Sequence, residues 1–255
     1  MTDRRALSTL FLIVFTDLIG FGIVIPLLPL YADHFHPTPV AFGLLMASYS
    51  AMQFIFSPIL GQLSDRIGRR PVLLISITGS VIGAVLFALG SSMAMLFASR
   101  LLAGACGGNI ATAQAVIADT TPPERRAKGM GLIGAAFGLG FIAGPALAGL
   151  LLSFGPSAPG WGAAACSLTA WLMALAFLPE TRAAGASPGA GHTSAVARLA
   201  AALRHPELAG LLGLGFAVVT GFAAFEVELH KVEPPEVERV NRSHWHRVAV
   251  RARLR

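Results

Sequence analysis

Charged residues are scarce in this chain of 255 residues: Asp, Glu, Lys and Arg make up 13% of it, against 55% hydrophobic residues. A soluble globular domain carries about 25% charged residues. The mean hydropathy of +0.68 likewise indicates a predominantly apolar chain. This composition excludes an ordinary soluble monomer, and we expect lipid to surround most of the chain.

Other features of catalytic and binding sites are missing as well. The two cysteines, Cys106 and Cys166, lie in apolar stretches without the spacing of a zinc site or a disulfide framework. His34 and His36 stand in a polar loop with too few neighbouring ligands for a metal. No Walker sequence occurs, so ATP hydrolysis is not expected. We therefore predict no metal, no cofactor and no enzymatic activity.

Long apolar runs dominate the sequence. Seven of them approach or exceed the length that crosses a bilayer as a helix. None alternates polar and apolar residues as a membrane β-strand does. The sequence therefore predicts an all-α, polytopic membrane protein. The predicted spans are residues 7–30, 40–60, 71–89, 93–118, 129–154, 161–178 and 208–225.

The basic residues are unevenly distributed among the loops. A net charge of +6 could indicate a nucleic-acid partner. However, eleven Lys and Arg residues lie on one side of the predicted spans, before the first span and in alternate loops. The intervening loops, residues 32–39, 90–92 and 155–160, contain none. Because positively charged loops stay in the cytoplasm, we predict a cytoplasmic N-terminus and a bilayer, not nucleic acid, as partner.

The composition changes after the sixth span. Residues 180–207 are rich in Ala, Gly, Ser and Pro and are predicted to be a cytoplasmic linker that follows a six-span bundle over residues 1–179. Residues 208–226 form a predicted seventh span. Residues 227–255 then hold seven of the 19 basic residues, against the charge pattern of the earlier loops. We expect this tail to result from a shifted reading frame or a premature end, or to stay cytoplasmic beside an uninserted seventh span.

Two charged residues fall well inside the predicted spans, and a third, Glu226, lies at the end of the seventh. Asp17 lies in the first span, roughly 15 Å deep at 1.5 Å per residue, and Arg100 lies in the fourth. A charge at the bilayer centre costs at least about 2.5–3.5 kcal/mol and is by default a functional candidate. The alternative is a structural pair between helices, or an Arg100 side chain that reaches the interface.

The predicted loop between the second and third spans has the spacing Gly-x-x-x-Asp-Arg-x-Gly-Arg-Arg over residues 61–70. Glycines permit a tight reversal and a close approach of the backbone. Asp65 can pair with the arginines or cap a helix N-terminus. The alternative is that any short cytoplasmic loop is basic.

Glycine and proline are concentrated in the fifth and first spans. In the fifth span, the pairs Gly134/Gly138 and Gly140/Gly144 have the i,i+4 spacing that allows close helix contact. Pro145 adds a bend that can act as a hinge. The first span holds two glycines and two prolines, and we expect it to be discontinuous beside its carboxylate, as in the wall of a cavity. The alternative is an ordinary kinked membrane helix.

Together these motifs resemble those of the major facilitator superfamily, over about residues 7–226. Residues 61–70 are similar to the superfamily's loop between spans two and three, and Arg100-Leu-Leu-Ala-Gly104 is similar to its span-four motif with a buried arginine. The glycines of span five resemble the antiporter motif, and span one resembles that of drug:proton antiporters. Residues 117–126 and 179–181 are similar to tetracycline-efflux relatives.

The resemblance implies a proton-coupled exporter of a drug or small metabolite in the bacterial inner membrane, which works by alternating access between two six-helix bundles. It places Asp17 and Arg100 on the substrate and proton pathway. It further implies a cytoplasmic gate and a hinge. The gate consists of Gly61, Asp65, Arg66, Gly68, Arg69 and Arg70, and the hinge of Gly140, Gly144, Pro145 and Gly149.

Two features depart from that family. Tetracycline exporters carry an acidic residue in span three, whereas residues 73–89 contain none, so tetracycline is not the expected substrate. Relatives have two six-helix bundles, and the second is absent from this chain, so we expect these 255 residues not to transport alone. The alternatives are an importer on the same fold, and a truncated, non-transporting membrane fragment that is either a pseudogene product or a half that binds a partner.

Overall fold

The chain divides into two compact units, residues 1–190 and 191–255. The predicted seventh span and linker lie mostly outside the described residues, and the predicted basic tail lies wholly outside them. The computed structural model describes residues 3–178, 180, 204–206, 208–210, 213–214 and 217.

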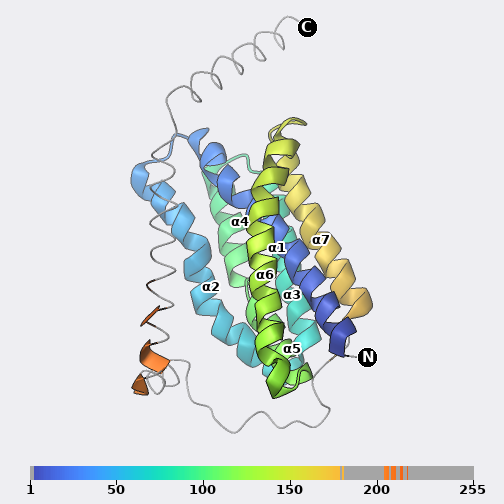
Figure 1. Ribbon diagram of the computed structural model, residues 1–255. Helices are drawn as coiled ribbons and strands as arrows, with labels where there is room; N and C mark the ends of the chain where they lie inside the picture. Colours follow the sequence, from blue (N-terminus) through green and yellow to red (C-terminus); the bar gives the residue numbers. More distant parts are fainter. Residues whose placement is uncertain are drawn as a thin grey trace, which may run out of the picture. The chain divides into compact units, whose positions relative to one another are not determined.

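The first unit is a bundle of long α-helices that run up and down beside one another (Figure 1). Six stretches of the described residues are long and apolar enough to cross a membrane, and α4 with α5 forms one of them. This confirms the predicted all-α fold with six spans in the first part of the chain. The helices are α1 (Asp3–Asp33), α2 (Pro39–Ile67), α3 (Arg69–Ala88), α4 (Met93–Ala105), α5 (Asn109–Thr120), α6 (Pro123–Leu152) and α7 (Ala158–Phe177).

Local sequence explains where several helices begin. The Thr38 hydroxyl accepts a hydrogen bond from the Ala41 amide at 3.2 Å, and Pro39 occupies the first position of α2. The Ser92 hydroxyl accepts from the Met95 amide at 3.3 Å at the start of α4. Hydroxyl caps satisfy amides that have no partner in the first turn, and proline has no amide to lose there.

Residues 61–70 are almost entirely helical, which corrects the prediction of a loop. Gly61 lies inside α2, and a Cβ there would meet nothing within 4 Å, so it makes no close approach. The reversal falls on Gly68 alone, whose φ of 110° lies in a region that L side chains rarely adopt. One glycine therefore turns the chain from α2 into α3.

The helix break occurs in the fourth span and not in the first. α1 continues as one helix through Pro26 and Pro29, so the expected discontinuity there is wrong. Neighbouring helices and small backbone adjustments tolerate proline in a membrane helix. Residues 106–108 instead separate α4 from α5. A Cβ at Gly108 would lie 2.6 Å from Leu60 Cδ1, so glycine lets α2 pack against the break.

α1 and α3 contribute most to the core. α1 packs on α6 and α7, while α3 packs on α7 and α4, and α2 packs on α4. The buried side chains form two apolar clusters, one around Leu10 and Ile13 of α1 and the other around Ile23 and Leu27. Asp17 stands between them along α1, so a polar layer separates two apolar layers.

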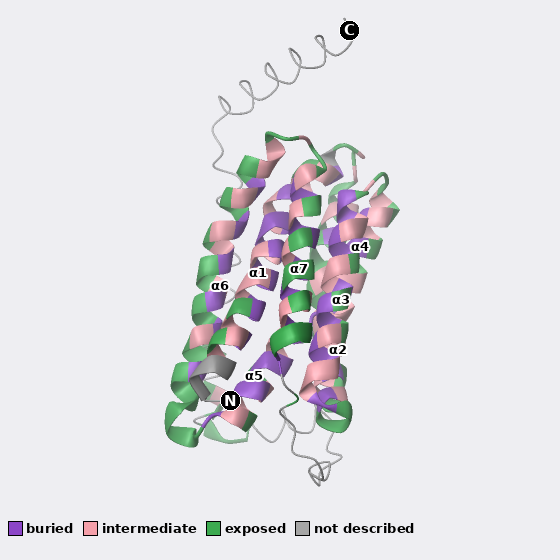
Figure 2. Ribbon diagram, turned by 90° about the vertical axis from the view of Figure 1, so that its right-hand side faces the viewer, coloured by how far each residue is buried: buried purple, intermediate pink, exposed green. Residues whose placement is uncertain are grey.

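The outer faces of the bundle are apolar. Figure 2 shows long exposed stretches on α6 and burial along the inward side of α1. Phe54 of α2 is 82% exposed and Ile142 of α6 is 73% exposed. Exposed apolar patches of this kind mark surfaces that contact lipid or another protein. They are the surfaces expected of a bundle whose solvent is the hydrocarbon of a bilayer.

Candidate functional site

A cavity of about 110 Å³ lies in the middle of the bundle. All seven helices contribute side chains to it. They include both charged residues that the sequence placed inside spans, so the fold brings Asp17 and Arg100 to one cavity. The polar lining residues are Asp17 of α1, Tyr49 and Gln53 of α2, Ser80 of α3, Arg100 of α4, Asn109 of α5 and Ser167 of α7.

Asp17 is 5% exposed and is held by two uncharged donors. The Asn109 Nδ2 amide donates to one carboxylate oxygen, and the Ser167 hydroxyl donates to the other at 2.9 Å. These donors come from α5 and α7, so a single carboxylate connects three helices. A buried charge needs hydrogen bonds of this kind to offset the loss of water.

Arg100 is 4% exposed and faces aromatic rings. Its guanidinium carbon lies 5.7 Å from the centre of the Phe87 ring and 6.0 Å from that of Tyr49. Its Nε donates to the Ser99 hydroxyl at 3.4 Å. No carboxylate of the described residues lies within 4.0 Å of its nitrogens. Asp17 and Arg100 thus share a cavity without forming an ion pair.

The break in the fourth span positions the donor to Asp17. The Gln53 amide donates to the Gly107 carbonyl at 3.1 Å, which satisfies a carbonyl that the broken helix leaves free. Cys106 fills the space beside Gly79, where no Cβ would fit. α5 then begins at Asn109, whose side chain is thereby directed at the carboxylate of α1.

Sequence reasoning missed five uncharged polar residues of this cavity, namely Tyr49, Gln53, Ser80, Asn109 and Ser167. The available signal was their occurrence inside apolar runs, where amides and hydroxyls usually bond across helices. That signal is weak because serine and tyrosine are common in membrane helices. The pairing of Asn109 with Asp17 depends on the break in span four, which the sequence did not reveal.

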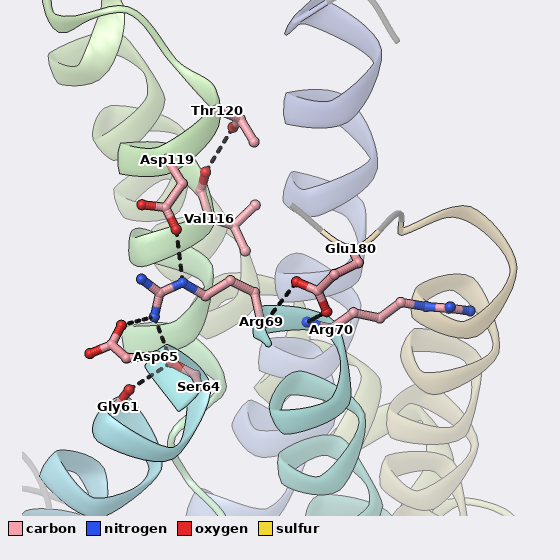
Figure 3. Close-up of polar contacts among 9 residues, drawn as sticks. All are labelled: Gly61, Ser64, Asp65, Arg69, Arg70, Val116, Asp119, Thr120 and Glu180. Atoms are coloured by element: carbon pink, nitrogen blue, oxygen red, sulfur yellow. Dashed lines mark hydrogen bonds and ion pairs between the residues drawn. The ribbon is translucent and has the colours of Figure 1, made fainter. Parts of the chain in front are cut away.

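A second polar cluster lies at the end of the bundle where α2, α3, α5 and α7 meet (Figure 3). Arg69 forms ion pairs with Asp65 at 2.6 Å and with Asp119 at 2.8 Å. It also donates to the Ser64 hydroxyl at 2.7 Å. The expected pairing of Asp65 with an arginine is therefore present. Asp119 is an additional partner that the spacing within residues 61–70 could not indicate.

Glu180 completes this cluster from beyond the end of α7. Its two carboxylate oxygens accept hydrogen bonds from the backbone amides of Arg69 at 3.0 Å and Arg70 at 3.3 Å (Figure 3). A carboxylate at a helix N-terminus is favoured by the amides and by the helix dipole. The Arg70 guanidinium turns the other way and donates to the Leu175 carbonyl at 2.6 Å. These hydrogen bonds connect the start of α3 to the end of α7.

The glycines of α6 fall into two groups. A Cβ at Gly144 would lie 2.5 Å from the Gly22 carbonyl carbon, and one at Gly140 would lie 2.9 Å from Leu18 Cβ. These two glycines therefore let α6 press against the backbone of α1, as their spacing predicts. A Cβ at Gly134 or Gly138 would meet nothing within 4 Å, so the close contact expected there is wrong.

The remaining residues of the predicted hinge lie beside this contact. Pro145 is inside α6 and does not end the helix. A Cβ at Gly149 would meet nothing within 4 Å. The contact between α1 and α6 therefore depends on Gly140 and Gly144, and not on Gly149.

Six spans around a cavity that holds a buried carboxylate and a buried arginine, with an ionic cluster joining spans at one end, define one helical bundle of a membrane transporter. The comparison with known families agrees. The sequence profile of the Major Facilitator Superfamily matches residues 10–231. The chain belongs to this superfamily.

Relatives include bacterial and animal proteins. The chain is 42% identical over 173 residues to the "Tetracycline resistance protein, class B" of Escherichia coli, covering 67% of this chain and 43% of that protein. It is 33% identical over 209 residues to the human "Major facilitator superfamily domain-containing protein 10", covering 70% of this chain and 45% of that protein. The chain thus spans about half the length of the curated relatives it matches.

Solved structures give the same fold. The crystal structure of the human organic anion transporter MFSD10 (TETRAN) superposes with a TM-score of 0.70 at 29% sequence identity, covering 85% of this chain and 61% of that one. The crystal structure of a peptide transporter superposes with a TM-score of 0.64, and at 20% identity it shows the fold alone.

Proposed function

We propose that this chain forms one six-helix half of a proton-coupled exporter of a drug or small metabolite, seated in a bacterial inner membrane with its N-terminus in the cytoplasm. Residues 1–179 form the bundle, and a second six-helix half completes the transport pathway. The observation that carries the proposal is Asp17, a carboxylate 5% exposed on a central cavity, which no cation of the described residues approaches within ion-pair distance. Intramembrane carboxylates of this kind serve as proton acceptors.

Protonation of Asp17 supplies the coupling. The ionised carboxylate accepts hydrogen bonds from Asn109 of α5 and Ser167 of α7. Hydrogen bonds to a charged acceptor are about twice as strong as neutral ones. A proton on Asp17 weakens both bonds and loosens α5 and α7 from α1. Gain and loss of one proton therefore shift the packing of three helices around the cavity, as alternating access requires.

The cluster around Arg69 is the cytoplasmic gate of this proposal. Asp65 and Asp119 have side chains that are 52% and 37% exposed. Exposed ion pairs contribute only about 0–1 kcal/mol each. Contacts of this strength can break and re-form in every transport cycle, while Glu180 keeps α3 and α7 together. The close contact of Gly140 and Gly144 with α1 is the hinge about which α6 moves.

The test is Asp17→Asn in a two-bundle protein that carries these spans. We expect proton-driven efflux to fall at least about a hundredfold, the lower end of the effect of losing a general acid–base group, with unchanged membrane insertion. Glu124→Gln is the matched control, because Glu124 is an exposed carboxylate at the start of α6, away from the cavity. Efflux with an unaltered rate and pH dependence in Asp17→Asn would reject the proposal.

A further inference from the structure

The last two turns of α1, residues 26–33, are joined to the rest of the helix by a weakened backbone. Pro26 and Pro29 lie inside α1. Proline has no amide hydrogen, so the carbonyls of Gly22 and Ile25 lack the amide four residues further on that would otherwise bond them. A helix bends most easily where prolines remove such bonds. Residues 26–33 are called the terminal segment of α1 below.

The part of α1 before the prolines is held closely by α6. A Cβ at Gly22 would lie 2.8 Å from the Gly140 carbonyl oxygen and 3.2 Å from the Cα of Gly144. Both are backbone atoms of α6, so the two helices touch there without side chains between them. A fixed helix that continues through a weakened backbone into a terminal segment has the arrangement of a hinge, in which a few residues absorb the motion.

The terminal segment follows directly after the stretch of α1 that lines the cavity. Val24 lines the cavity and stands two positions before the first proline. Beyond it, Leu27, Leu28 and Ala32 are at most 3% exposed and belong to an apolar cluster to which α3 and α4 also contribute. The terminal segment thus lies, along α1, between the cavity and the end of the bundle opposite to the Arg69 cluster.

Tyr31 connects the terminal segment to two other parts of the bundle. Its hydroxyl donates a hydrogen bond to the Pro156 carbonyl, in the connection between α6 and α7. Its ring stacks on that of Phe87 in α3, with the ring centres 4.6 Å apart and 28° between the planes. Stacked aromatic pairs at this spacing attract each other beyond the area that they bury. A bend at the prolines that swings the segment outward must break both contacts.

We propose that the terminal segment is a strap that closes the cavity at this end of the bundle, that it opens by bending at Pro26 and Pro29, and that Tyr31 is the latch that keeps it closed. Tyr31 is a positioning residue, because it acts through the strap and lies outside the cavity. The inference goes beyond the proposed function. It gives no role to Asp17, and it holds or fails whether or not protons drive efflux.

Hydrogen exchange of the 255-residue chain in phosphatidylcholine nanodiscs measures the opening of the strap. Tyr31→Phe removes the hydroxyl and keeps the ring. Loss of one neutral hydrogen bond changes an opening equilibrium about two- to tenfold. The amides of residues 27–33 should therefore exchange faster by about that factor, while those of α7 should not change. Ser153→Ala is the matched control, because it removes a hydroxyl whose bond, to the Leu150 carbonyl at 2.7 Å, stays within the end of α6.

Thiol labelling measures whether the strap closes the cavity. Cys106 and Cys166 are first replaced by serine, and Val24→Cys then places a single thiol on the cavity wall. A water-soluble thiol reagent should label this position about two- to tenfold faster when Tyr31→Phe is added. Circular dichroism checks that each variant keeps its helical bundle.

A proline substitution tests the hinge. Pro29→Ala supplies the amide that the Ile25 carbonyl lacks, so it should bring exchange and labelling in the Tyr31→Phe chain back towards the rates of the latched strap.

Four results overturn the inference. Unchanged exchange in a folded Tyr31→Phe chain refutes the latch. Faster exchange without faster labelling at Val24→Cys refutes closure of the cavity by the strap. An increase that survives Pro29→Ala refutes bending at the prolines. An equal increase with Ser153→Ala indicates general loosening of this end of the bundle and refutes the specific role of Tyr31.

Discussion

The contact between α1 and α6 leaves no room for a side chain at Gly144. A Cβ there would lie 2.5 Å from the carbonyl carbon and 2.6 Å from the Cα of Gly22. Both of these are backbone atoms, so no rotamer change relieves the overlap. Ordinary contact begins near 3.4 Å, and Gly144→Ala must therefore push the two helices apart by roughly 1 Å, which is the scale of a core that has been overpacked.

The expected cost follows from matched substitutions on the same helix. Overpacking costs about 1–3 kcal/mol, and we expect Gly144→Ala to lose that much stability. Gly138→Ala adds the same methyl group where nothing lies within 4 Å. It should be neutral or gain about 0.5–1 kcal/mol, because alanine restricts the unfolded chain more than glycine does.

Unfolding in mixed detergent micelles measures this difference. Increasing fractions of sodium dodecyl sulfate unfold each variant, and far-ultraviolet circular dichroism follows the loss of helix. Gly144→Ala should unfold at a lower detergent fraction than the unsubstituted chain, and Gly138→Ala should not. If both variants unfold at the same fraction, α6 does not press against α1 through Gly144, and the reasoning is refuted.

Three further predictions concern the cavity, the gate and the topology. In a two-bundle protein, Asn109→Ala should lower efflux without preventing insertion, because Asp17 loses a donor; a normal efflux rate would exclude Asn109 as a positioning residue. Asp65→Asn should slow transport and leave ligand binding intact, since the ionic cluster lies at the end of the bundle; loss of binding with normal cycling would contradict a gate. A cysteine at the exposed Glu124 should resist an impermeant thiol reagent added outside intact cells, and labelling beyond that of the unsubstituted protein would reverse the orientation.

The sequence alone was sufficient to predict the spans, because a helix that crosses the hydrocarbon of a bilayer must be apolar over its whole length there. Apolar runs of the required length predicted all six helical segments of the first unit, and the helix at Met93–Thr120 was placed correctly even though it is broken. The charges inside the spans, Asp17 and Arg100, could also be found from sequence alone. Their insertion cost singles them out whatever surrounds them.

Tertiary structure alone decided which residues touch. The i,i+4 spacing is identical for Gly134/Gly138 and Gly140/Gly144, yet only the second pair faces α1, because the face that a helix presents depends on its rotation in the bundle. The sequence could not place Asn109 and Ser167 on Asp17, since they are 92 and 150 residues away along the chain. Hydropathy fixes how far a helix extends through the bilayer, whereas helix rotation and the break at residues 106–108 determine which polar groups meet inside it.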